Sequence, residues 1–236
     1  MWRYFKITGL ILLCFAFNVT SIWPWYGDTW GPISRQQIAS IANEAIDGVW
    51  SPGRTFTNQS SLSGHYETYY AGTTYVGEAY SQNTPRETWA EFAGAVRNPY
   101  SGLGNDCSGF VSVCWKLPRV YTTYTMDSEI NAGSSHFIKL GGNGSGPGVT
   151  LELGDAMNDA NSHIVMFDKY VSGGISTMES TTWKHMRKVR SWSNLASYYP
   201  VRRKELGGGS ATQPYNGGYV SQDPAQAGID IQSGAA

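Results

Sequence analysis

One short segment combines a cysteine with residues that can activate it. The segment reads Asn105-Asp106-Cys107-Ser108-Gly109-Phe110. Asn105 or Asp106 can cap a helix, which would put Cys107 in the first helical turn. Unpaired N–H groups and the helix dipole stabilise a thiolate there, and the same N–H groups can hold the oxyanion of a tetrahedral intermediate. The segment therefore predicts a cysteine nucleophile, with a buried, inert thiol as the competing interpretation.

The rest of this predicted helix, which runs from 105 to 117, indicates how the nucleophile is placed. Phe110, Val111, Cys114 and Leu117 lie on the same side as Cys107, so this face should pack on a sheet. Cys114 is expected to be a small buried hydrophobic residue. Seven helical residues separate the two thiols by about 10 Å, beyond the reach of a disulfide, so both should be free.

The expected base is His163, because a thiolate hydrolase needs a proton acceptor. It opens a predicted strand, His163-Ile164-Val165-Met166-Phe167, after a Gly154-Asp155 turn and a polar stretch at 158–162. Alternation puts His163 on the row of Val165 and Phe167, and an imidazole there can meet the first turn of a helix laid across the sheet. The remaining histidines, His65, His136 and His185, lie in polar or basic segments and are expected to be solvated.

These segments together resemble the NlpC-type family of cell-wall peptidases and the related CHAP amidases. The resemblance covers residues 34–205 and includes the ending Tyr199-Pro200-Val201-Arg202-Arg203. It implies a papain-like fold that hydrolyses peptide or amide bonds of peptidoglycan without metal or other cofactor. Tyr80 is similar to the tyrosine that the family places before its cysteine to line the substrate site. Asp106 and Ser108 would by the same analogy bind the end of a stem peptide, or act only as helix cap and first-turn residue.

The third catalytic position, which orients the imidazole, is assigned to Glu179 by its similarity to the glutamate of some CHAP-like enzymes. Strand geometry argues against it. An ideal two-residue loop at Gly173-Gly174 would set Glu179 opposite Asp168 and on the wrong face. A bulge or a longer loop restores the face but leaves Glu179 about 13 Å along the hairpin from His163, at roughly 3.3 Å per residue. Asn161 and Asp155 are the alternative candidates for this third catalytic position.

The chain departs from the family pattern in two places. A helix at 85–96 is inserted between Tyr80 and Cys107, and no wall-binding repeat is recognisable. Both departures leave the substrate preference open rather than the type of reaction. Cleavage within the stem peptide or cross-bridge is favoured over cleavage of the muramoyl–alanine amide. The alternatives are a thiol acyltransferase or deamidase that acts on a protein, and a non-catalytic cell-wall-binding protein.

The elements that must position these residues follow an α+β order, with helices first and antiparallel strands after. Besides the helix of Cys107, helices are predicted at 34–50 and 85–96. Strands are predicted at 163–170, 175–180, 188–192 and 198–202, and the glycine-rich stretch 140–149 should be an irregular loop. The hydrolase domain is expected at 34–205, between an N-terminal linker (22–33) and a disordered tail (206–236).

Charge and the N-terminus bound the cellular setting. The net charge of −1 gives no electrostatic reason to expect nucleic acid or an anionic membrane as partner. Residues 1–21 fit a secretory signal peptide, because two cations precede an apolar run of about half the roughly 20 residues that a membrane span needs. An uncleaved anchor is the alternative. We therefore expect an exported protein whose partner is peptidoglycan; the oligomeric state is left open.

Overall fold

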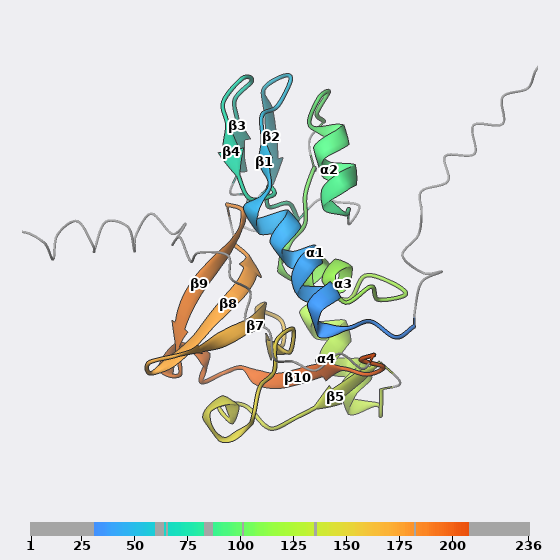
Figure 1. Ribbon diagram of the computed structural model, residues 1–236, viewed down its shortest axis with the longest axis vertical. Helices are drawn as coiled ribbons and strands as arrows, with labels where there is room; N and C mark the ends of the chain where they lie inside the picture. Colours follow the sequence, from blue (N-terminus) through green and yellow to red (C-terminus); the bar gives the residue numbers. More distant parts are fainter. Residues whose placement is uncertain are drawn as a thin grey trace, which may run out of the picture.

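The computed structural model describes residues 31–59, 64, 66–82, 87–100, 102–134, 136–181 and 183–207. The expected signal peptide, most of the linker and tail, Cys14 and His65 lie outside these residues. No helix in the described part of the chain has the length and apolar character that crossing a membrane requires. The described elements form a mixed α+β structure (Figure 1).

A six-stranded antiparallel sheet forms the base of the molecule, in the order β5-β10-β6-β7-β8-β9. Its strands are β5 (Phe137–Lys139), β6 (Ala156–Asp159), β7 (His163–Val171), β8 (Gly174–Ser180), β9 (His185–Ser191) and β10 (Tyr199–Arg203). The sequence predicted β7 to β10 to within a few residues. It missed β5, a three-residue strand too short for a periodic signal.

Helices cover one face of this sheet. They are α1 (Arg35–Asp47), α3 (Cys107–Cys114) and α4 (Thr123–Asn131). A capping box between Ser34 and Gln37 starts α1, and Ile38, Ala42 and Ile46 join the main core cluster. The first predicted helix was drawn too long, because Val49–Trp50 forms strand β1 instead. The sequence analysis did not predict α4, whose residues carry only a weak apolar stripe.

A small lobe projects beyond the sheet (Figure 1). It contains β1 with β4 (Tyr75–Val76), β2 (Phe56–Gln59) with β3 (Tyr66–Tyr69), and α2 (Trp89–Ala95). Its core is largely aromatic: Trp50 stacks on Tyr75 and meets Phe92 edge-on, at centroid distances of 4.8 and 5.0 Å. The helix expected at 85–96 is thus part of this lobe, and its described portion is shorter.

The folded part extends slightly past the predicted domain boundaries. Ile33 is buried and pairs with Leu206, which packs on the main core. The buried Arg203 side chain donates hydrogen bonds to the carbonyl oxygens of Trp115, at 2.7 Å, and of Gly31. The two ends of the described chain are therefore held together beside α3.

Candidate active site

Cys107 is the first residue of α3, as the sequence predicted. Asp106 caps the helix and accepts hydrogen bonds from the Gly109 N–H, at 2.6 Å, and from the Ser108 hydroxyl, at 3.0 Å. Cys107 is 8% exposed, whereas Cys114 is completely buried, and both thiols are free. Burial raises the pKa of Cys114 well above its usual value, which makes that thiol unreactive.

The loop that precedes Cys107 is fixed by buried polar groups. The Asn105 side-chain amide donates to Glu78 Oε1, at 2.6 Å, and to the Glu87 carbonyl oxygen, at 2.7 Å. The Asn105 carbonyl oxygen accepts from the Ser180 hydroxyl at 2.8 Å. Residues of the lobe and of the sheet therefore set the position from which α3 begins.

His163 is the first residue of β7, and its imidazole lies between Cys107 and Glu179. His163 Nε2 is 2.9 Å from Glu179 Oε2, which leaves Nδ1 as the nitrogen that can serve the thiol. Burial lowers the pKa of His163, but its interactions with Cys107 and Glu179 outweigh this effect and raise the pKa to about 9. The site therefore stabilises an imidazolium ion next to the sulfur.

The structure removes the geometric objection to Glu179. The loop between β7 and β8 is Ser172-Gly173, so Val171 pairs with Gly174, and a bulge between Phe167 and Lys169 shifts the register again. Met166 then pairs with Met178, which sets Glu179 opposite Val165. Glu179 therefore points to the same face of the sheet as His163, and the two residues are only two positions apart along the hairpin. The assumed loop at Gly173-Gly174 was wrong, and so was the 13 Å separation.

Glu179 is completely buried and fully occupied by hydrogen bonds. Arg190 reaches both carboxylate oxygens, from Nε at 3.0 Å and from a terminal nitrogen at 2.5 Å, and the Thr177 hydroxyl donates to Oε1 at 2.8 Å. Burial raises the pKa of this carboxyl, but the bonds to His163 and Arg190 prevail and lower it to about 2. The sequence analysis missed Arg190; only the pairing of β8 with β9 brings it beside Glu179.

The expected packing of the His163 row needs a correction. Ile164 and Met166 pack with α3 in the main core, whereas Val165 and Phe167 belong to a separate cluster on the opposite face of the sheet. His163, the first residue of its strand, nevertheless interacts with Cys107.

The expected substrate-binding residues lie beside the nucleophile. Tyr80 is buried, and its backbone forms an isolated parallel β-bridge with that of Asn105, which lies two residues before Cys107. The Tyr80 hydroxyl accepts a hydrogen bond from the Gln82 amide at 3.0 Å. Asp106 and Ser108 bond to each other, so the structure supports their roles as helix cap and first-turn residue directly.

The substitutes for Glu179 are engaged elsewhere. Asp155 is buried and accepts from Arg35 and from both ends of the Arg202 guanidinium at 2.7 to 3.0 Å. Asn161 is exposed and occupies the turn before β7 with a φ of 67°, a backbone conformation that asparagine tolerates well.

Two of the remaining histidines, which the sequence analysis expected to be solvated, are buried or half-buried. His185 is completely buried, with Nδ1 2.9 Å from the Glu78 carbonyl oxygen, and burial lowers its pKa to about 4. His136 is half-buried, and its Nδ1 is 2.5 Å from Glu129. The buried carboxylate of Glu179 is bonded to His163, so the choice of the base rests on that residue.

Among the described residues, no three His, Cys, Asp or Glu side chains are grouped as metal ligands. No protein-family model, curated protein or solved structure matches this chain. The assignment of the site therefore depends on its geometry and on the local motifs described above.

Proposed function

We propose that the protein is a papain-like cysteine hydrolase that cleaves peptide or amide bonds of bacterial peptidoglycan. The observation that carries the proposal is the position of His163 between Cys107, at the start of a helix, and the buried carboxylate of Glu179. A nucleophile, a base and a group that orients the base are the parts that covalent amide hydrolysis requires.

The proposed reaction assigns one role to each group. His163 takes the proton of Cys107, and the thiolate attacks the amide carbon while N–H groups of the first helical turn hold the oxyanion. His163 then gives its proton to the leaving nitrogen, the C–N bond breaks and a thioester remains. A water molecule, deprotonated by His163, attacks the thioester and releases the carboxylic acid and the thiol. Glu179 keeps the imidazole oriented and stabilises its charged form throughout.

The choice of peptidoglycan rests on the resemblance of the Cys107 and His163 segments to NlpC-type peptidases. Tyr80 supports it, because it lies beside the loop that leads to Cys107, where a substrate-lining tyrosine would be needed. The helix of the nucleophile, packed on an antiparallel sheet, is compatible with a papain-like arrangement. The proposal includes export to the envelope and a preference for stem-peptide or cross-bridge bonds.

The test uses purified protein and isolated cell-wall sacculi. Wild-type protein should release soluble muropeptides, whose masses identify the bond that is cut. Cys107→Ala should abolish release, whereas Cys114→Ala, which removes the buried thiol, should retain it. Equal release by wild type and Cys107→Ala would refute the proposal.

Labelling with iodoacetamide separates the alternatives. Rapid labelling of Cys107 combined with intact sacculi would point to an acyltransferase or deamidase that acts on a protein. Labelling of Cys107 no faster than that of Cys114, together with binding to sacculi, would point to a non-catalytic wall-binding protein.

A further inference from the structure

Tyr198 lies in the same row of the sheet as His163, although no motif singles it out. β10 pairs with β6 through Tyr199 and Asn158, and β6 pairs with β7 through Asp159 and His163. Continuing the first register by one residue sets Tyr198 opposite Asp159. Tyr198, Asp159 and His163 are therefore lateral neighbours on one face, with roughly 10 Å between the outer two backbones at the usual strand spacing.

The ring of Tyr198 is held in place by apolar packing. It belongs to the buried cluster that contains Val165, Phe167 and Leu195, on the face of the sheet that also carries His163 and Glu179. Tyr198 is only 7% exposed. A ring fixed in this way presents its hydroxyl in one place, with little loss of entropy when that hydroxyl binds a ligand.

The phenol of Tyr198 lies within the electrostatic influence of the charged groups of the site, and its hydroxyl has no hydrogen-bond partner among the described residues. Arg190, Glu179, Asp159 and Cys107 all act electrostatically on this phenol. None of the described residues forms a hydrogen bond with the hydroxyl, and it is not among the side-chain atoms sealed from solvent without a partner. The hydroxyl therefore remains accessible to a ligand on the face of the sheet that carries His163.

We propose that the Tyr198 hydroxyl donates a hydrogen bond to a carbonyl oxygen of the peptide bound at Cys107. This inference rests on the proposed function to the extent that Cys107 is the nucleophile toward a peptide carbonyl. Burial raises the pKa of Tyr198 to about 12, so the hydroxyl stays protonated at neutral pH and acts as a donor rather than as a proton-transfer group.

The test compares two compounds that react with the Cys107 thiol: iodoacetamide, which alkylates it, and the peptide aldehyde acetyl-alanyl-alaninal. The aldehyde forms a reversible thiohemiacetal: the sulfur bonds to the aldehyde carbon, the carbonyl π bond breaks, and the thiol proton moves to the oxygen. Tyr198→Phe keeps the ring and removes only the hydroxyl. We expect it to weaken aldehyde binding roughly three- to tenfold, the value of one neutral hydrogen bond, while the rate of alkylation by iodoacetamide is unchanged.

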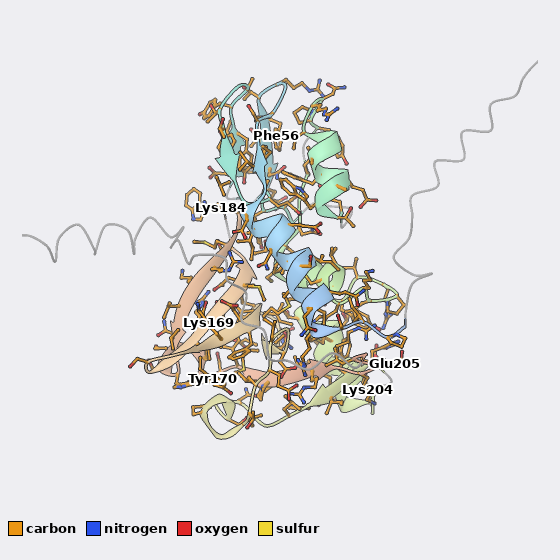
Figure 2. All side chains as sticks on the ribbon, in the orientation of Figure 1. Phe56, Lys169, Tyr170, Lys184, Lys204 and Glu205 are labelled. Atoms are coloured by element: carbon orange, nitrogen blue, oxygen red, sulfur yellow. The ribbon has the colours of Figure 1, made fainter. Side chains whose placement is uncertain are left out.

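The matched control is Tyr170→Phe. Tyr170 packs on Phe167 at the far end of β7 (Figure 2), and its hydroxyl bonds to the backbone of Val149 and Leu151. This variant should leave both measurements unchanged.

Three results would overturn the inference: equal aldehyde affinity of Tyr198→Phe and wild type, a parallel loss of affinity and alkylation, or no binding of the aldehyde by wild type. Wild type that binds the aldehyde but leaves sacculi intact would refute the proposed substrate alone. The Tyr198 result would then still decide the hydrogen bond.

Discussion

The carboxylate of Glu179 is hydrogen-bonded to two basic side chains. His163 and Arg190 are both cationic partners of the same buried carboxylate, so a neutral amide in its place would leave both without their counter-charge. We expect Glu179→Gln to lower the rate of wall hydrolysis by about 10² to 10⁴-fold, as for the loss of the orienting acid in other triads. The measurement is the release of muropeptides at pH 7.

Asp168 supplies the control for that variant. It lies on the same hairpin, and its carboxylate accepts from the Ser176 hydroxyl at 2.9 Å instead of from the imidazole. Asp168→Asn should retain activity within about threefold, a tolerance small beside the loss expected above. Comparable losses in the two variants would mean that the hairpin, and not the charge of Glu179, is what the reaction needs.

The same carboxylate makes stability depend on pH. The pKa of Glu179 is about 2 in the folded protein, below its ordinary value of 4.5. A depressed pKa contributes stability that is complete above the ordinary value and is lost as the pH falls toward 2. The difference in unfolding free energy between wild type and Glu179→Gln should therefore be largest near pH 5 and shrink below pH 4.5. It should also decrease above about pH 6.5, because Glu179 helps to raise the pKa of His163 to about 9 and that contribution to stability is lost as the pH rises. Urea unfolding at several pH values measures it, and a difference that stays constant down to pH 3 would contradict the assignment.

At the scale of the element, the loop before α3 is tightly constrained by its neighbours. Gly104 has a φ of +100°, and a Cβ atom there would lie 1.8 Å from the Ala79 carbonyl oxygen. Its N–H also donates to the Glu87 carboxylate. We expect Gly104→Ala to destabilise the protein by more than about 1 kcal/mol and to slow alkylation of Cys107 by displacing the start of the helix.

Thermal unfolding and alkylation rates test this prediction, with Gly142→Ala as the control. A Cβ atom on Gly142 would meet no atom within 4 Å, and its φ is not in the left-handed region. Gly142→Ala should therefore be neutral in both measurements. If Gly104→Ala behaved in the same way, the loop would not determine the position of the nucleophile.

The elements also show how far the sequence alone could lead. The cap before Cys107 and the strand after the Gly154-Asp155 turn are local signals, and both were predicted correctly. The contact between His163 and Glu179 depends on a bulge near Asp168, which has no local signature, so simple strand geometry gave the wrong distance. Arg190 and Tyr198 are brought in by strands whose order in the sheet could not be derived from alternation alone.

The whole molecule connects the lobe to the sheet through buried polar groups. Ala79 pairs with Lys184, which lies where the lobe meets the sheet (Figure 2). Beside this junction, the Glu78 carbonyl oxygen accepts from the His185 N–H at 2.9 Å. The Glu78 carboxyl group binds Asn105 through Oε1, while its Oε2 has no partner among the described residues. The junction thus holds the aromatic lobe and the loop of the nucleophile in one arrangement, at the cost of burying a titratable group.

This cost predicts the effect of Glu78→Gln. Burial, followed by the charge of Glu87, raises the pKa of Glu78 well above 4.5, so the folded protein keeps a proton that the unfolded chain loses above that pH. Wild-type stability must then decrease as the pH rises from 4.5 toward the folded pKa. Glutamine keeps the oxygen that Asn105 needs and does not titrate, so the variant should gain stability relative to wild type as the pH rises from 5 to 8.

Urea unfolding over that range measures the gain, with Glu44→Gln on the exposed side of α1 as a control expected to stay within about 0.5 kcal/mol of wild type. A difference between Glu78→Gln and wild type that is independent of pH would mean that Glu78 is ionised in the folded protein, and that the junction is held by charge rather than by a protonated acid.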